Sequence, residues 1–299
     1  MKKVAIFGQT YTVNADKEIK ILLTSLEKHN IVAFFEESFY NVLKEHEHLT
    51  KKYPTFSSFE DLNNSFDLFF SLGGDGTMLR AVTYVRNLGI PILGINTGRL
   101  GFLANIQKSE IAESIELLIA KEYTIQERTL LSIKTSPEVE TFDELSFALN
   151  EITIARQNTT SMIGVKTYLN NEYLTNYWSD GLIIATPTGS TGYSLSCNGP
   201  VISPDSKSLV ITPIAPHNLN ARPMVIPDNT SLELEVDSRE KSFLISLDSR
   251  ITSVPKSTKI YIQKSPFNIR SVIPSNQSFL TTLRTKLLWG EDTRNESNL

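Results

Sequence analysis

The sequence is poor in cysteine, in histidine and in long apolar stretches. A single cysteine, Cys197, among 299 residues excludes an intramolecular disulfide and a zinc site made of several thiolates. Of the four histidines, only His46 and His48 are close together, and the charged residues around them favour a solvated surface over a metal site. No apolar run approaches the roughly 20 residues of a membrane-spanning helix. The start, MKKVAIFGQTYTVNADKE, is basic but has only a short apolar run and lacks the long apolar core of a signal peptide, so we expect a cytoplasmic protein without a membrane partner.

An excess of positive charge is also missing. The chain has 29 Lys and Arg against 33 Asp and Glu, with a pI near 5.7. This balance excludes a general nucleic-acid coat, which needs a basic surface, but allows a locally basic pocket. The 40% hydrophobic content is enough for packed cores. At about 100–200 residues per domain, the length predicts about two domains.

The first third of the chain alternates between strand and helix patterns. Short apolar runs predict strands at 4–7, 31–35, 66–72 and 90–95. Apolar residues at helical spacing predict helices around 19–26, 78–85 and 109–121, the first capped by Asn14. Because this alternation is typical of a parallel sheet covered on both faces, we expect an α/β domain over residues 1–122.

Short strands with turn signals between them follow from about residue 123. They are predicted at 130–135, 151–156, 165–169, 173–177, 182–186, 209–213, 231–236, 243–247 and 259–263. Asn170 and Asn171 form a hairpin signal between two of them. We therefore expect an all-β domain over 123–274. The last segment, 275–299, contains a helical pattern at 276–289, which we expect to pack back on the first domain.

A glycine-rich loop, Gly73-Gly74-Asp75-Gly76-Thr77, follows a buried strand and precedes a helix. Glycines allow close approach of the backbone, and amides at a helix start favour anions, so the loop suits phosphate. It matches neither the Walker loop nor the GxGxxG fingerprint. The acid among the glycines would repel phosphate, which points to a role toward a hydroxyl or a metal beside it. A tight turn without function is the alternative.

A second glycine-rich segment runs from Asp180 to Pro200 behind another apolar strand, and Tyr193 adds an aromatic face. Its small hydroxylated residues are able to hydrogen-bond sugars and bases; they are Thr186, Thr188, Ser190, Thr191, Ser194 and Ser196. An irregular polar loop is the alternative. Asn150 and Glu151, at the start of a strand, form a weaker candidate for gripping a ribose diol.

At these residues the chain resembles the bacterial NAD kinase family, which converts NAD to NADP. The family's motifs occur in order along nearly the whole chain: GGDGT at 73–77, NTGxLGF at 96–102, NE at 150–151, SDGL at 179–182, TPTGSTGYSLS at 186–196, PIAPH at 213–217, RPMVIP at 222–227 and a TLRxKLxWG-like tail at 282–290. GGDGT alone also resembles loops of phosphofructokinases and lipid kinases. The DGL…TPTGSTGYS segment is much more specific.

The resemblance implies an α/β amino-terminal domain, a β-rich carboxy-terminal domain, a site at their junction and a homodimer or homotetramer. It implies NAD and ATP as substrates and a divalent metal, expected to be Mg²⁺, whose ligands the sequence does not identify. By position, Asp75 is the general base that deprotonates the adenosine 2′-hydroxyl. The phosphate-binding turn is Gly73, Gly74, Gly76 and Thr77, and Arg80, one turn later, is a candidate phosphate contact.

The remaining implied contacts concern the dinucleotide. Asn150 and Glu151 hold its hydroxyls, and Asp180 and Ser196 recognise the adenine edge. Further contacts come from Phe102, from Ala215 and from the pocket wall formed by Thr191, Gly192, Tyr193, Ser194, Leu195 and Ser196. Trp178, at a position that is often basic in the family, lies near the substrate and bears on the choice between NAD and NADH. Arg250 matches a turn that reaches a neighbouring subunit's site.

Two positions depart from the family pattern in small ways. Gly192 stands where alanine is common, and we expect the fold to stay intact. Asn198 stands where glycine is usual, and we expect it to keep the turn because Asn tolerates left-handed backbone. Other activities that remain open are a GGDGT-type kinase for a lipid or sugar, a non-enzymatic NAD(P) sensor and, less favoured, a phosphatase acting on NADP.

Overall fold

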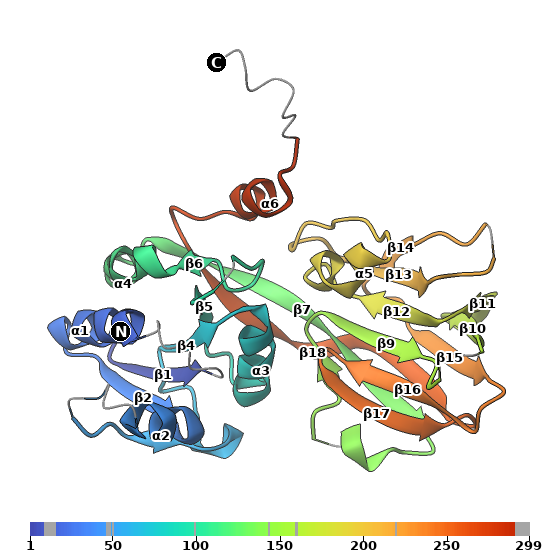
Figure 1. Cartoon of the computed structure of the whole chain (residues 1–299), viewed down its shortest axis with the longest axis horizontal. Helices are drawn as coiled ribbons and strands as arrows, with labels where there is room; N and C mark the ends of the chain where they lie inside the picture. The colour runs from blue at the N-terminus through green and yellow to red at the C-terminus, as the bar shows by residue number, and fades with distance from the viewer. Residues whose placement is uncertain are drawn as a thin grey trace. The chain divides into compact units, whose positions relative to one another are not determined.

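The structure, a computed structural model, describes residues 1–8, 16–45, 49, 51–98, 100–142, 144–158, 161–218 and 220–290. The predicted helix cap Asn14 and the pair His46 and His48 lie outside these residues. The chain divides into two compact units, each treated separately below. The first unit is Met1–Gln126 with Ile269–Leu299, and the second unit is Glu127–Asn268 (Figure 1).

The first unit is built on a parallel sheet. Its strands are β1 (Lys3–Gly8), β2 (Val32–Glu36), β3 (Thr55–Phe56), β4 (Leu68–Gly73) and β5 (Ile92–Asn96), in the spatial order β3-β2-β1-β4-β5. The short β6 (Ile106–Gln107) and the end of β18 (Lys259–Pro274) pair in parallel with β5. The strand order reverses between β1 and β4. In open parallel sheets, ligands bind beyond the carboxyl ends of the strands at such a reversal.

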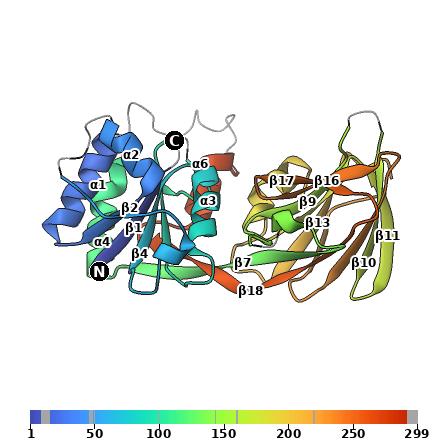
Figure 2. The ribbon, with the colours of Figure 1, turned by 90° about the horizontal axis from the view of Figure 1, so that it is seen from below.

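Helices cover both faces of this sheet, as the alternating pattern predicted (Figures 1 and 2). On one face, Phe70 and Leu72 of β4 share a core with α1 (Asp16–Lys28), α2 (Glu37–Glu45) and α4 (Ile111–Ala120). On the other face, Phe69 lies against Tyr84 of α3 (Asp75–Val85), with ring centroids 6.5 Å apart. Neighbouring residues of one strand thus serve opposite faces, which explains the uninterrupted apolar run at 66–72.

The described part of the carboxy-terminal segment, up to residue 290, packs on the first unit, which confirms the expectation for the helical tail. Helix α6 (Phe279–Leu287) is capped by Ser278, whose hydroxyl accepts a hydrogen bond from the amide of Thr281 at 3.1 Å. The Phe279 ring lies 6.3 Å from the Phe102 ring. Gln277 donates a hydrogen bond to Glu110 at 3.1 Å. The described helices include none that is long and apolar enough to cross a bilayer.

The second unit consists of two antiparallel layers. One contains β11 (Glu172–Ser179), β10 (Ile163–Leu169), β15 (Leu232–Asp237) and the start of β18, together with β7 (Tyr123–Ser136) and β8 (Phe147–Ala148). The other has the order β14 (Met224–Pro227), β13 (Ser208–Ile214), β12 (Gly181–Ala185), β9 (Glu151–Ala155), β16 (Ser242–Leu247) and β17 (Arg250–Pro255). Alternate residues such as Val165, Ile184 and Phe243 fill the core shared by both layers.

The structure differs from the predicted elements in three ways. The prediction did not include helix α2, the short helix at residues 193–196, the short strands β3, β6 and β8, or the edge strands β14 and β17. Strands β7 and β18 are much longer than predicted and run from one unit into the other. The units therefore divide at 126/127 and 268/269 rather than at 122/123 and 274/275. The turn predictions hold, because Asn170, Asn171 and Asn198 have φ values of +49°, +70° and +65°.

Candidate functional site

The glycine-rich loop at 73–77 joins the end of β4 to the start of α3, at the reversal of the strand order. Gly73 has a φ of +154°, and a Cβ there would lie 2.2 Å from the Thr77 hydroxyl oxygen, so the position admits no side chain. A Cβ on Gly74 or Gly76 would meet nothing within 4 Å. The loop therefore presents open backbone at a helix start, which suits an anion.

The carboxylate of Asp75 is held by backbone amides of the following loop. Its Oδ2 accepts from Phe102 at 2.8 Å, and its Oδ1 accepts from Leu103 and Ala104, both at 3.0 Å. A Cβ on Gly101 would lie 1.8 Å from Asp75 Oδ1, so this approach requires glycine. The side chain stays 31% exposed. Asp75 is thus fixed in orientation and still open to a ligand.

A residue of the tail joins this group. The ammonium of Lys286 on α6 lies 4.0 Å from Asp75 Oδ2 and 4.9 Å from the centre of the Phe102 ring. We refer to Gly73–Thr77, Gly101, Phe102 and Lys286 as the Asp75 group. The sequence analysis had singled out the tail motif and the NTGxLGF motif without giving a role to Lys286 or Gly101. Their places in these motifs were the signal in the sequence that could have identified Lys286 and Gly101 as site residues. Their contacts with Asp75 are visible only in the folded structure.

Arg80 lines a different part of the first unit from the Asp75 group. It is exposed and lines a cavity of about 200 Å³ with Gly8, Glu36 and Tyr84. Glu36 is buried, and its Oε2 accepts a hydrogen bond from the amide of Phe39 at 2.9 Å. The structure thus places Arg80 beside the ends of β1 and β2, and its predicted phosphate contact stays a prediction.

In the second unit, the chain turns at half-buried Asn150 into buried Glu151 at the start of β9, and both side chains have unused hydrogen-bonding capacity. Asn150 Oδ1 and Glu151 Oε2 are buried and have no partner. A Cβ on Gly192 would lie 3.1 Å from Glu151 Oε2 and 3.5 Å from Asn150 Nδ2, so the three residues converge. Burial first, and then the charge of Asp248, raises the pKa of Glu151 to about 8. We refer to Asn150, Glu151 and Gly192 as the Asn-Glu site.

In the hydroxyl-rich segment at 186–196, several hydroxyl groups form hydrogen bonds with other groups of the protein. Thr186 donates to the carbonyl of Leu149 at 2.6 Å, and Ser190 donates to that of Pro187 at 2.7 Å. Ser194 shares a 2.8 Å hydrogen bond with Thr212. All three side chains are fully buried, and the prediction that their hydroxyls bind sugars or bases stays a prediction. Their hydroxyls hold the loop in shape.

The rest of that segment offers a surface. Tyr193 is 46% exposed at the start of the short helix α5 (Tyr193–Ser196), and Ser196 is exposed as well. Thr191 and Leu195 are half-buried. These side chains, and the backbone of Ser194, remain candidates for the predicted pocket wall.

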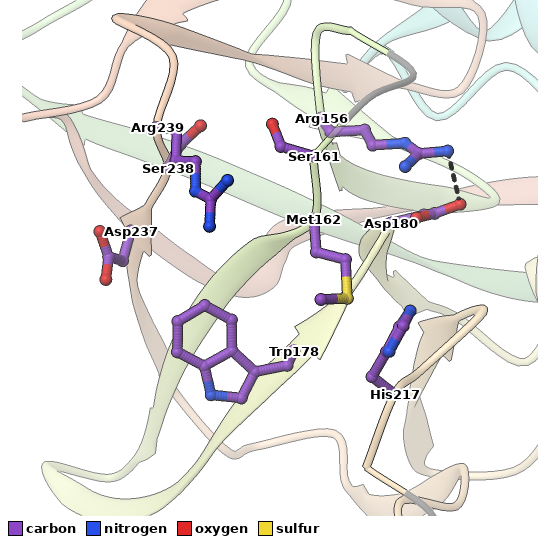
Figure 3. Close-up of a pocket in the computed structure, with 9 residues that line it drawn as sticks. All are labelled: Arg156, Ser161, Met162, Trp178, Asp180, His217, Asp237, Ser238 and Arg239. Atoms are coloured by element: carbon purple, nitrogen blue, oxygen red, sulfur yellow. Dashed lines mark ion pairs between the residues drawn. The ribbon is translucent and has the colours of Figure 1, made fainter.

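Asp180 and Trp178 line a cavity of about 510 Å³ in the second unit (Figure 3). Asp180 is paired with Arg156 at 2.9 Å, a partner that the sequence analysis did not identify. The amide of His217 donates to the carbonyl of Trp178 at 2.8 Å, which ties the PIAPH segment to this cavity. Ala215 in the same segment is exposed with a φ of +44°.

Arg250 is engaged within its own unit. Its guanidinium donates to the carbonyl of Leu145 at 2.6 Å and to that of Phe147, and it lies 3.9 Å from Asp248. Burial lowers the pKa of Arg250, and the charge of Asp248 opposes that shift. The predicted contact of Arg250 with a neighbouring subunit's site stays a prediction.

Gly189 offers a test of how the hydroxyl-rich loop supports the Asn-Glu site. A Cβ there would lie 2.0 Å from the carbonyl oxygen of Asn150, which is backbone and unable to yield easily. We expect Gly189→Ala to lower the free energy of unfolding by about 2 kcal/mol, measured by urea denaturation. Gly192→Ala, whose Cβ would come no closer than 3.1 Å to Glu151 Oε2 and 3.2 Å to the carbonyl oxygen of Gly189, should remain close to the parent in stability. Equal stabilities of all three proteins would contradict this reading.

The described residues contain no cluster of three or more His, Cys, Asp or Glu side chains able to hold a metal ion. Mg²⁺ commonly takes one or two carboxylates and otherwise substrate phosphates and water. The exposed carboxylate of Asp75 beside an open phosphate-type loop fits a Mg²⁺ ion of that kind. It does not fit a metal held in a cage of protein ligands.

Models of known protein families match both units of the chain. The model of the ATP-NAD kinase N-terminal domain matches residues 4–123, and that of the ATP-NAD kinase C-terminal domain matches residues 149–274. The NAD kinase of Flavobacterium psychrophilum is 55% identical over 293 residues, which cover 98% of this chain and 100% of the relative. That of Bacteroides fragilis strain ATCC 25285 is 43% identical over 292 residues, with 98% and 99% covered.

Solved structures share the fold. Yeast NADH kinase complexed with NADH superimposes with a TM-score of 0.86 at 22% identity, covering 99% of this chain and 89% of that one. An NAD kinase from Archaeoglobus fulgidus in complex with ATP gives a TM-score of 0.74 at 24% identity, covering 96% and 98%. At these identities the likeness concerns the arrangement of helices and strands.

Proposed function

Because this chain belongs to the NAD kinase family, we propose that it transfers a phosphoryl group from ATP to the 2′-hydroxyl of the adenosine ribose of NAD. The products are NADP and ADP, so the protein is a phosphotransferase with an alcohol acceptor. One observation supports this proposal most directly. An amide-anchored carboxylate, Asp75, stands at the first turn of a helix in a loop that is otherwise suited to phosphate.

We assign the proton transfer to Asp75. A sugar hydroxyl is a poor nucleophile, and a carboxylate within hydrogen-bond reach aligns it and takes its proton. Oδ1 accepts two amide hydrogen bonds, whereas Oδ2 accepts only one. Since each carboxylate oxygen offers about two lone-pair sites, Oδ2 keeps a site for the substrate hydroxyl. Its proton passes to Asp75 as the oxygen attacks the γ-phosphorus and ADP leaves.

The loop around Asp75 is assigned to the donor phosphates. Gly74 and Gly76 leave the backbone open, and the helix of 11 residues behind them presents its amino terminus. Phosphoryl transfer depends mainly on positioning and charge neutralisation. A bound Mg²⁺, with Asp75 as its carboxylate neighbour, would neutralise the phosphate charge. Lys286 adds a positive charge of the protein's own at 4.0 Å from Asp75.

The second unit is assigned to NAD. The Asn-Glu site offers one amide oxygen and one carboxyl oxygen without partners, which suits hydroxyl groups. Tyr193 offers an exposed ring for a base, and Asp180 and Ser196 are assigned to the adenine edge, with Ala215 and Trp178 beside them. We also propose that the enzyme is cytoplasmic and that it forms a homodimer or homotetramer. Light scattering of the purified protein tests the oligomeric state.

The direct test is turnover. Purified protein with NAD, ATP and Mg²⁺ should form NADP, detected with an NADP-dependent dehydrogenase, and NADH run in parallel measures the preference between the two acceptors. Radiolabelled ATP with a sugar phosphate or a lipid tests the rival kinases. Label transferred only to these acceptors, or no product from folded protein, would contradict the proposal; binding of NAD without turnover would favour a sensor.

A further inference from the structure

A buried aspartate lies directly behind the Asn-Glu site. Asp248 occupies the turn between β16 and β17, and its side chain is only 6% exposed. Its carboxylate accepts hydrogen bonds from three consecutive amides, those of Leu149 at 3.0 Å, Asn150 at 2.8 Å and Glu151 at 3.2 Å. Its own amide donates to the carbonyl of Glu151 at 3.0 Å. Four hydrogen bonds thus join one residue to a single turn of the chain.

This arrangement is costly for a purely structural contact. Burying a carboxylate carries a large desolvation penalty unless hydrogen bonds compensate for it. Asp248 also has a φ of +52°, in the left-handed region. Strained and desolvated groups of this kind persist where the surroundings need a fixed geometry. The geometry fixed here is that of Asn150 and Glu151.

The side chains of the same turn carry the unsatisfied groups. Asn150 Oδ1 and Glu151 Oε2 are buried without partners, and both side chains converge on Gly192. We propose that Asp248 is a positioning residue for NAD binding, which holds the Asn150–Glu151 turn from behind so that both side chains face the ligand hydroxyls. This inference rests on the proposed function, because it takes NAD as the ligand of the Asn-Glu site.

The charge of Asp248 gives this role a measurable signature. After burial, the nearby Asp248 charge is the main cause that raises the pKa of Glu151 to about 8, and the amide of Tyr193 opposes it. Burial raises the pKa of Asp248 too, but three amides and the Arg250 guanidinium favour its ionised form. We therefore place the proton of this pair on Glu151 at neutral pH.

The other ionisable groups near Glu151 are those of α5 and β17. Burial raises the pKa values of Tyr193 and Cys197, so both stay neutral below the pKa of Glu151. Arg250, 3.9 Å from Asp248, stays charged throughout the range. Asp180 acts on Tyr193 and is paired with Arg156. Glu151 is accordingly the group expected to titrate between about pH 7 and pH 9.

The direction of the pH dependence of NAD binding follows from the chemistry of the ligand. Ribose hydroxyls donate hydrogen bonds, so they favour the ionised form of Glu151, which is the minor form below a pKa of about 8. NAD binding should release a proton, and its Kd should fall about tenfold from pH 7 to pH 9. Replacing Asp248 by Asn removes the charge and should move the midpoint down by about one pH unit.

The experiment is calorimetric titration of NAD into the full-length protein across this pH range, in two buffers that differ in ionisation enthalpy. At pH 9, where Glu151 is mostly ionised in both proteins, Asp248→Asn should bind NAD about tenfold more weakly because the positioning is lost. The variant should show the lower midpoint, and Glu151→Gln should show no pH dependence. Asn suits the left-handed backbone at this position. If Asp248→Asn does not fold, Asp248→Ser replaces it with the same expected midpoint. Asp205→Asn, an exposed aspartate in the same unit, is the control and should match the wild type.

Two results would overturn the inference. An unchanged midpoint in the Asp248 variant means that the residue does not act on Glu151, even where affinity falls equally at every pH. A pH dependence that survives Glu151→Gln means that another group titrates. Because binding is measured without turnover, a protein that binds NAD with the expected profile but forms no NADP would contradict the proposed function alone.

Discussion

Replacing Asp75 by Asn is expected to lower kcat about 10³-fold, within the range of general acid–base catalysis, and to change the KM for NAD little. The amide of Asn takes no proton from the substrate hydroxyl. Apart from Phe102 and the 2′-hydroxyl contact of Asp75 itself, the contacts assigned to NAD lie in the second unit, so the KM should be set mainly there. Steady-state kinetics with NADP detection measures both constants. Near-normal turnover by the folded variant would remove Asp75 from the role of general base.

The structure adds a complication that a control resolves. Asp75 accepts three amide hydrogen bonds, so the Asn variant also loses part of a structural anchor. Asp61 makes a similar set of contacts, accepting from the amides of Ser57 and Ser58 and from the Ser57 hydroxyl. Asp61→Asn should loosen its loop in a comparable way and leave kcat unchanged. Loss of kcat in both variants would mean that loosened structure, rather than lost chemistry, explains the effect.

Gly101→Ala is expected to lower kcat about 10²-fold without touching an ionisable group. The added Cβ would lie 1.8 Å from Asp75 Oδ1, so the carboxylate must leave the amides of residues 102–104 or the loop must move. Either change misplaces the base by an ångström or more. The loss should appear in kcat at saturating NAD and ATP, and the far-ultraviolet circular dichroism should stay that of the parent.

Gly98→Ala is the matched control in the same loop. The nearest atom to its added Cβ would be the Asn96 side-chain oxygen at 4.0 Å, which is ordinary contact. This variant should retain parental kcat. If Gly101→Ala also retained parental kcat, the anchoring of Asp75 by this loop would have no importance for turnover.

Hydrophobic patterning was enough for most of the fold. The run at 66–72 predicted β4 because Phe69 and Phe70 serve opposite covered faces, and such strands read as continuous apolar segments. The edge strand β14 was not predicted, because Met224 and Val225 are both exposed and the strand therefore shows neither an alternating pattern nor a buried apolar run. The full lengths of β7 and β18 were not predicted, because each strand passes from the core of one unit to the core of the other and its pattern of buried residues changes along the way.

The sequence singles out candidate residues for the site but not their contacts. Asp75 is an acid among glycines, and Glu151 is an acid beside an amide at the start of a strand. Ser194 and Thr186 looked equally suited to ligands, because a sequence does not reveal whether a hydroxyl points at a carbonyl of its own loop. Asp248 stayed without a role, because its three amide partners lie about 100 residues earlier in the chain.

The division of the first unit into two stretches of sequence has a consequence for biosynthesis. Val272 belongs to the core formed by residues 4–118, and Lys286 reaches Asp75 from α6. Ribosomes add about 5–20 residues per second, so this core waits several seconds for its last strand while the second unit is already complete. Released chains that end at residue 268 should therefore hold a folded second unit and an unfinished first one. Chaperones that bind exposed apolar surface would find it in the part of the chain made first.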